Sequence, residues 1–270
     1  MSQATPAASP DLLGTIVAAA RQITDVRRRQ VADAVLEKTA AARRPDGAGF
    51  VRALRDGAAP RVIAECKRRS PSRGILREEY RPAEHASAYA AAGAAAISVL
   101  TEPTFFDGSL DHLAAVRSAV SVPLLRKDFI VDRYQVLEAV ANGADGVLLI
   151  VGALTPAALG GLLADARACG VAALVEVHDA AELAIAVDAG AEIIGVNSRN
   201  LRTLSVEPAL HEQLAPRIPR TAVAVAESGL RTPADLERLA QAGYHAFLVG
   251  ERLIAEPDPG AALRALRSTR

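Results

Sequence analysis

The sequence has 270 residues, which is enough for one large domain or two small ones, and 50% of them are hydrophobic. Its 31 basic and 31 acidic residues give a formal net charge of zero, which leaves no electrostatic case for nucleic acid or an anionic membrane as a partner. The two cysteines, Cys66 and Cys169, lie far apart in sequence, so a cytoplasmic protein without disulfides is expected, and no apolar run approaches the ~20 residues of a membrane span.

Residues 1–60 contain helical patterns and no strand-like run. The opening MSQATPAASPDLL has no basic stretch followed by an apolar core, so we expect no signal peptide. The segment DLLGTIVAAARQITDVRRRQVADAVLEK predicts one or two amphipathic helices, and 43–49 predicts a loop. We therefore predict that 1–60 form a helical extension packed on a domain formed by 61–270.

From residue 61 onward the chain repeats a helical segment, a glycine and a short apolar run. The repeat glycines are Gly93, Gly143, Gly170, Gly190 and Gly243. Residues that favour the start of a helix precede several helical segments, in two cases followed by proline. These expected N-caps are Asp132, Thr155, Asp179 and Thr232.

The apolar runs predict eight strands. They lie near 62–66, 96–100, 122–126, 146–150, 172–176, 192–196, 222–226 and 246–249. Near-continuous apolar strands are typical of parallel sheets covered on both faces. Eight strand–helix units favour a single closed (β/α)₈ TIM barrel. The alternative is an open doubly wound sheet, which we disfavour because no Gly-rich dinucleotide or phosphate-loop motif follows the first strand.

Charged residues gather where the predicted strands end, and in such barrels catalytic groups come from those ends. Glu65 and Lys67 share one face of the first strand because side chains alternate, and Cys66 then faces the helices. Glu65 and Lys67 alone could be a buried ion pair. Together with Lys127 and Glu176 at the same barrel end, they favour general acid–base chemistry.

Glycines after the last two strands indicate a phosphate site. Ser228 and Gly229 follow the seventh strand, and Gly250 follows the eighth. Backbone N–H groups at these loops often bind phosphate in this fold.

The five histidines are scattered, so we expect no metal site, and His178 is interpreted as a loop residue.

Six motifs in order resemble those of the indole-3-glycerol phosphate synthase family of tryptophan biosynthesis. They are AECKRRSPSRG, SVLTEPTFFDGS, LLRKDFIVDRYQVLEA, ALVEVH, GVNSRNL and VAESGL. The similarity runs from about Val62 to Leu253, and the N-terminal helices match more loosely.

The resemblance implies a role for each matching position. Lys127 would be the general acid of ring closure, Glu176 its acid–base partner in dehydration, and Glu65 an aid to proton transfer. Asn197 would orient Glu176 or the substrate. The catalytic candidates are thus Lys127, Glu176, Glu65, Lys67, Asn197 and Ser228. The candidates for binding the phosphate, the carboxylate, the hydroxyls and the aromatic ring are Lys67, Ser70, Phe105, Phe129, Arg199, Gly229, Gly250 and Glu251.

Three positions depart from the family pattern. Asn200 stands where aspartate is frequent, which would weaken a pairing of Arg199. Glu251 replaces a serine or threonine, so we expect its side chain to point away from a phosphate and only its N–H to contribute. Asp107 replaces a glycine, which would concern loop shape.

The resemblance implies a carboxy-lyase that uses no cofactor. It would convert an anthranilate joined to an open-chain deoxyribulose phosphate into indole-3-glycerol phosphate by ring closure, decarboxylation and dehydration. The expected partner is this small phosphosugar substrate, and the expected state is a monomer or weak homodimer. The alternatives are a non-catalytic phosphosugar-binding paralogue and a phosphoribosyl anthranilate isomerase. The isomerase would need a reactive cysteine, which the outward direction of Cys66 argues against.

Overall fold

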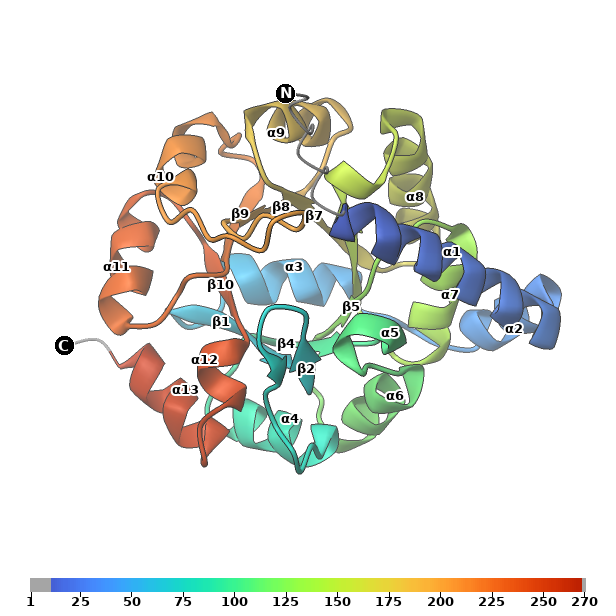
Figure 1. Ribbon diagram of the computed structural model, residues 1–270, viewed down its shortest axis with the longest axis horizontal. Helices are drawn as coiled ribbons and strands as arrows, with labels where there is room; N and C mark the ends of the chain where they lie inside the picture. The colour runs from blue at the N-terminus through green and yellow to red at the C-terminus, as the bar shows by residue number, and fades with distance from the viewer. Residues whose placement is uncertain (1–10, 269–270) are drawn as a thin grey trace, which may run out of the picture.

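A computed structural model describes residues 11–268, and its eight longer strands close into a parallel barrel. Around the barrel the order is β1-β10-β9-β8-β7-β6-β5-β4 (Figure 1). Their bounds are β1 (Arg61–Cys66), β4 (Ala96–Leu100), β5 (Leu124–Lys127), β6 (Gly146–Ile150), β7 (Ala172–Val177), β8 (Ile193–Asn197), β9 (Val223–Glu227) and β10 (Ala246–Val249). The predicted (β/α)₈ barrel is confirmed, and the open sheet is excluded.

Helices form a ring outside the strands (Figure 1). In chain order they are α4 (Pro82–Ala91), α5 (Pro103–Phe106), α6 (Leu110–Ala119), α7 (Arg133–Ala141), η1 (Val151–Ala153), α8 (Pro156–Ala168), α9 (Ala180–Asp188), α10 (Leu210–Leu214), η2 (Ala215–Arg217), α11 (Pro233–Gln241), α12 (Glu251–Ile254) and α13 (Pro259–Arg267). The expected N-caps are confirmed, because the side chains of Asp132, Thr155, Asp179 and Thr232 each accept a hydrogen bond from a backbone N–H in the first turn.

The five repeat glycines all have positive φ, from +74° to +110°. Gly143 shows the reason. Its φ of +90° lies in a region that other residues rarely adopt, and it reverses the chain between α7 and β6. The glycine between helix and strand is therefore a conformational requirement of the repeat.

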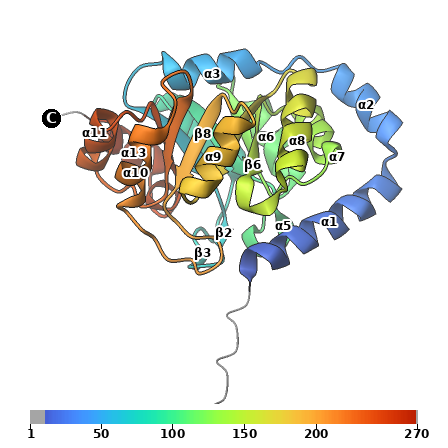
Figure 2. The ribbon, with the colours of Figure 1, turned by 90° about the horizontal axis from the view of Figure 1, so that it is seen from above.

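Three helices precede the barrel, namely α1 (Leu12–Gln30), α2 (Asp33–Ala41) and α3 (Gly47–Arg55). Helix α3 crosses the end of the barrel where the strands begin, and its buried Phe50 lies beside Leu125 and Gly146 inside the barrel. In Figure 2, α3 and the hairpin of β2 (Arg69–Ser70) and β3 (Gly74–Ile75) lie on opposite sides of the strands. One end of the barrel is thus plugged by apolar side chains and the other is left for a site. The first ten residues, part of the predicted extension and of the signal-peptide assessment, lie outside the described residues.

Several strands begin one or two residues later, or end one residue later, than predicted. The third predicted strand began at Val122, but β5 begins at Leu124, because Pro123 has no N–H to donate to a neighbouring strand. As a result, Lys127 and Glu227 are the last residues of β5 and β9 instead of loop residues.

No helix within residues 11–268 is long and apolar enough to cross a membrane.

Candidate active site

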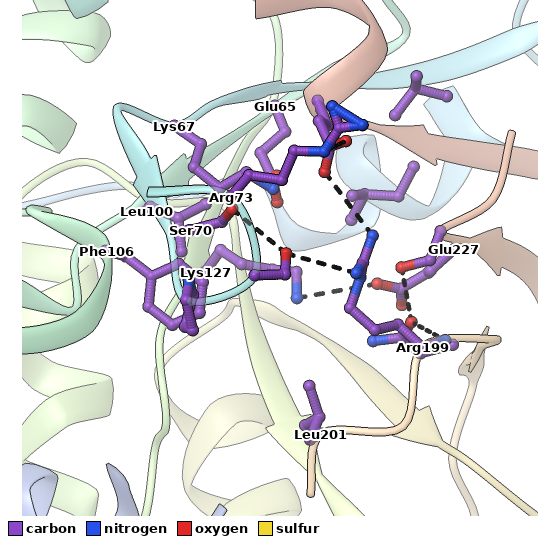
Figure 3. A pocket seen from close by; sticks show the side chains of 18 of the residues that line it. Glu65, Lys67, Ser70, Arg73, Leu100, Phe106, Lys127, Arg199, Leu201 and Glu227 are labelled. Carbon is purple, nitrogen blue, oxygen red and sulfur yellow. Dashed lines mark hydrogen bonds and ion pairs between the residues drawn. The ribbon is translucent and has the colours of Figure 1, made fainter. Parts of the chain in front are cut away.

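A cavity of about 590 Å³ opens at the carboxyl ends of the strands. Polar side chains from β1, β5, β7, β8 and β9 line it, together with the β2–β3 hairpin and the first turns of α1. Figure 3 shows Glu65, Lys127 and Glu227 among the lining side chains. Of the predicted site residues, those that line it are Glu65, Lys67, Ser70, Lys127, Phe129, Glu176, Asn197, Arg199, Ser228, Gly229, Gly250 and Glu251.

Strand β1 supplies an ion pair to this cavity. Nζ of Lys67 lies 2.5 Å from Oε1 of Glu65, and Glu65 is buried. A β-carbon added at Gly250 would lie 2.2 Å from Oε1 of Glu65, so the carboxylate fits only beside a glycine. Cys66 faces the helices, as predicted, and belongs to the apolar layer outside the barrel. The pKa of this thiol is raised, mainly by burial, so Cys66 is no reactive thiolate.

Lys127 stands between two carboxyl groups from other strands. Its Nζ lies 3.1 Å from Oε2 of Glu176 and 3.8 Å from Oε2 of Glu227. Both glutamates are buried, with exposures of 0% and 1%. A β-carbon at Gly195 would meet Glu227 at 2.1 Å, so a second glycine leaves room for a second carboxyl group.

Burial and neighbouring charges together move the pKa values of Lys127, Glu176 and Glu227 apart. Burial opposes the charged form of Lys127, but the carboxylates of Glu176, Glu227 and Glu65 outweigh it and raise its pKa. Burial, then repulsion by Glu176, raises the pKa of Glu227 well above 4.5. Burial acts against Glu176 as well, but the ammonium of Lys127 and the imidazole of His178 lower its pKa. Glu176 thus favours its charged form, whereas Glu227 holds a proton to higher pH than an ordinary glutamate, a pattern that suits acid–base work.

A small hydrogen-bonded unit joins β8 to β9 beside these groups. Oδ1 of Asn197 accepts hydrogen bonds from Oγ of Ser228 at 2.7 Å and from the backbone N–H of Arg199 at 3.0 Å. Asn197 also helps to lower the pKa of Glu176 by hydrogen bonding. Ser228 and Gly229 have positive φ values of +65° and +74°. This conformation turns the chain sharply at the cavity wall.

The side chain of Glu251 does not turn away from the cavity, so that expectation is wrong. Its Oε1 lies 2.9 Å from Nε of Arg73, and its Oε2 lies 3.7 Å from Nη2 of Arg199. The β2–β3 hairpin brings Arg73 within reach, and two guanidinium groups there favour a carboxylate that points inward. The carboxylate therefore lies beside Arg73 and Arg199 at the mouth of the cavity.

The apolar wall is formed by Phe106 and Phe129, whose ring centroids lie 6.1 Å apart. Phe105 does not line the cavity, so its predicted place in the wall is wrong. Helix α5 is a single turn, and successive side chains on a turn point about 100° apart, so only one of the two phenylalanines faces the cavity.

Ser70 is buried in the cavity wall, with its Oγ 3.4 Å from Oγ of Ser72. Nη1 of Arg199 donates to Oγ of Ser72 at 3.4 Å, which links the hairpin to the loop after β8.

Within residues 11–268 no group of three or more His, Cys, Asp and Glu side chains could hold a metal ion.

A family model described as indole-3-glycerol phosphate synthase matches residues 13–266. The chain belongs to the indole-3-glycerol phosphate synthase family. "Indole-3-glycerol phosphate synthase 2" of Streptomyces coelicolor is 50% identical over 255 residues, covering 94% of this chain and 98% of the relative. The indole-3-glycerol phosphate synthase of Parafrankia sp. is 53% identical over 236 residues, or 87% of both chains. That of Azoarcus sp. is 45% identical over 257 residues, covering 91% of this chain and 97% of the relative.

Solved structures outside the indole-3-glycerol phosphate synthase family share the fold alone. Thiamine phosphate pyrophosphorylase from Pyrococcus furiosus has a TM-score of 0.59 at 18% identity, covering 77% of this chain and 93% of that chain. The N-acetylmannosamine-6-phosphate 2-epimerase from Clostridium perfringens has a TM-score of 0.59 at 15% identity, covering 75% and 90%.

Two departures from the synthase pattern have structural partners. Oδ1 of Asn200 accepts hydrogen bonds from the N–H groups of Arg202 and Thr203, at 2.8 and 3.1 Å, so it shapes its own turn. The carboxylate partner of Arg199 is instead Glu251. Asp107 has a φ of +52°, a conformation that glycine adopts readily, and its Oδ2 accepts from Arg68 at 2.7 Å. Its effect therefore extends beyond loop shape.

Sequence reasoning missed three groups near the synthase site. Glu227 lies one residue beyond the predicted seventh strand and was given no role. Arg73 lies in an exposed hairpin whose approach to the cavity has no sequence signal. His178 was interpreted as a loop residue, yet its Nε2 lies 3.3 Å from Oε1 of Glu176. Alternation could have found it. Side chains two residues apart in an extended segment point to the same side, and His178 lies two residues after Glu176.

Proposed function

We propose that Lys127, Glu176 and Glu227 carry the chemistry by which this chain makes indole-3-glycerol phosphate from 1-(2-carboxyphenylamino)-1-deoxyribulose 5-phosphate. The observation that carries the proposal is the ammonium of Lys127 held between two buried carboxyl groups whose pKa values shift in opposite directions. Such a set holds both a proton donor and a proton acceptor within reach of one bound molecule.

The cavity offers a separate surface to each part of this substrate. The phosphate binds the backbone of Ser228, Gly229 and Gly250 together with Lys67. Arg199 and Ser70 bind the anthranilate carboxylate and the sugar hydroxyls. The aromatic ring packs on Phe129 beside Phe106, which takes the place assigned to Phe105.

Ring closure needs the aromatic carbon that bears the carboxylate to attack the keto carbon of the sugar. Holding the two carbons in contact removes much of the entropic barrier. The keto oxygen gains negative charge as the bond forms, and Lys127 donates the proton that makes it a hydroxyl group. The electron pair of the new bond comes from the ring, which the arylamine nitrogen makes electron-rich.

Loss of CO₂ returns the bonding pair to the ring and restores its aromaticity. Dehydration then needs a base for the C–H next to the nitrogen and an acid for the departing hydroxyl. Glu176, which favours its ionised form, accepts the carbon-bound proton. Glu227, which keeps its proton to higher pH, supplies the acid, and the Glu65–Lys67 pair assists proton transfer.

The direct test is to incubate the purified chain with the carboxyphenylamino-deoxyribulose phosphate and follow indole fluorescence and CO₂ release together. We expect one CO₂ for each indole formed. Binding of the substrate without either product would support the non-catalytic alternative and overturn the proposal.

We further propose that the protein acts in the cytoplasm as a monomer or weak homodimer and does not bind nucleic acid. Two free cysteines and a net charge of zero support this proposal. Sedimentation equilibrium at micromolar and higher concentrations tests the oligomeric state. A tight dimer at the lowest concentration would contradict it.

A further inference from the structure

Three side chains form a row that leads from the barrel wall to Lys127. Nδ1 of His178 lies 3.1 Å from Oε2 of Glu182, and Nε2 of His178 lies 3.3 Å from Oε1 of Glu176. The other oxygen of Glu176, Oε2, lies 3.1 Å from Nζ of Lys127. Glu176 lines the cavity, whereas His178 does not, so the histidine stands behind the carboxylate.

Local structure fixes His178 in this place. It directly follows β7, and Glu182 lies in the first turn of α9. The backbone N–H of His178 also donates to Oε2 of Glu182 at 2.7 Å. The side chain of His178 is 13% exposed, so few other orientations are open to it.

The position of the ring between two carboxylates favours a proton on each of its nitrogens. A carboxylate only accepts hydrogen bonds, so a neutral imidazole would turn a lone pair toward one of the two glutamates. The contact with Glu176 is an ion pair whose angle lies outside good hydrogen-bond geometry, so its attraction is mainly Coulombic. Burial opposes the cation, but Glu176 and Glu182 outweigh it and raise the pKa of His178 to about 10.

The charged groups that face His178 among residues 11–268 are Glu176 on β7 and Glu182 on α9. Lys127 of β5 faces the far oxygen of Glu176. Among residues 11–268 the cation that acts on Glu227 is Lys127, which lies farther from it than from Glu176. The surroundings of the two buried carboxyl groups are therefore unequal.

We propose that His178 is a positioning residue which, as an imidazolium held by Glu182, makes Glu176 the ionised member of the Glu176–Glu227 pair and aims it at Lys127. The inference rests on the proposed role of Glu176 in the reaction. His178 touches no substrate and acts only through Glu176. Lys127 acts in the same direction, so loss of His178 weakens the selection without abolishing it.

Two glutamine variants separate this role from that of a structural tie. In His178→Gln the cation is gone, and we expect kcat to fall at least about tenfold, the effect of one pKa unit, with KM changed less than about twofold. In Glu182→Gln an oxygen remains to accept the backbone N–H, but the charge is lost. The pKa of His178 then falls, and kcat should decline between about pH 6.5 and 10 in a limb that the parent protein lacks.

His245→Gln is the matched control, because His245 lies just before β10 at the opposite end of the barrel. It should keep the parent pH profile. A Glu182→Gln profile that superimposes on the parent profile, with kcat of His178→Gln within about twofold of the parent, would overturn the inference.

Two further measurements keep the inference testable on its own. Nitrogen-15 spectra of the parent protein, with the His178 ring assigned through its own backbone resonances, should show His178 doubly protonated at pH 8, and a neutral ring would overturn the inference even if the variants misfold. Glu176→Gln tests the underlying role. If Glu176→Gln is inactive while His178→Gln is unaffected, only the inference fails, and if Glu176→Gln is fully active, the proposed role of Glu176 fails with it.

Discussion

Nζ of Lys127 at the end of β5 lies 3.1 Å from Oε2 of Glu176 on β7, across the width of the strand that separates them. The barrel order places β6 between the two strands, so this contact joins next-but-one neighbours in the barrel. Its geometry depends on two registers, in which Leu125 pairs with Gly146 and Ile150 with Glu176. A slip of one residue in either would turn one of the two charges out of the cavity.

Lys67→Ala should weaken substrate binding. The variant removes a cation from the proposed phosphate site and leaves the buried carboxylate of Glu65 without its partner at 2.5 Å. We expect KM to rise about tenfold or more, since a charge-assisted contact contributes ~1.5–3 kcal/mol. Steady-state kinetics measure this, with Lys38→Ala on the exposed face of α2 as the matched control. An unchanged KM would remove Lys67 from the phosphate site.

Glu251→Ser should strengthen substrate binding. The carboxylate of Glu251 pairs with Arg73 and Arg199 at the mouth and competes there with an anionic substrate. Because partly exposed pairs contribute ~0–1 kcal/mol, we expect KM to fall by up to about fivefold with kcat unchanged. The control is Glu37→Ser, which breaks a pair with Arg133. A higher KM in Glu251→Ser alone would mean that the carboxylate helps to form the site.

Gly250→Ala should damage the site through Glu65. Its new β-carbon would lie 2.2 Å from Oε1 of that carboxylate, so the Glu65–Lys67 pair must shift. We expect lower activity and a loss of ~1–3 kcal/mol in the free energy of unfolding, as overpacking costs. Gly160→Ala in α8 is the matched control, because no atom lies within 4 Å of its added carbon, and it should gain ~0.5–1 kcal/mol. Equal stability changes in thermal unfolding of the two variants would contradict the steric account.

The pH dependence of stability should report His178. Its pKa is raised from 6.5 to about 10, so the folded state binds an extra proton between these values. The stabilisation is therefore complete below about pH 6.5 and is lost as the pH rises to about 10, at up to ~1.4 kcal/mol per pH unit. Denaturant unfolding at several pH values measures it as the difference between the parent and His178→Gln. A difference that grows with pH would have the wrong sign.

The fold could be read from the sequence because each repeat carries its own local signals. Thr232 followed by Pro233 begins α11, and Gly243 ends the turn that follows it, independent of distant contacts. Strand limits have no such local signal, since they depend on which residues find partners on a neighbouring strand. Glu227 illustrates the consequence, because a limit placed one residue early made it a loop residue.

The site could be read only as far as strand direction fixes it. Lys127 and Glu176 reach one cavity because their strands run parallel. The direction of Glu251 is set by contacts between loops that are distant in sequence. Arg73, which draws Glu251 inward, is 178 positions away from it along the chain (251 − 73). Such contacts have no periodic signal in the sequence.

The most direct test of the central claim is the turnover of Lys127→Ala beside Lys38→Ala, measured by indole fluorescence with substrate at saturation. Circular dichroism would establish that both variants are folded. We predict that kcat of Lys127→Ala falls by ~10²–10⁴-fold, the usual contribution of a general acid, whereas Lys38→Ala keeps the parent value. A folded Lys127→Ala variant with kcat within about threefold of the parent would contradict the account.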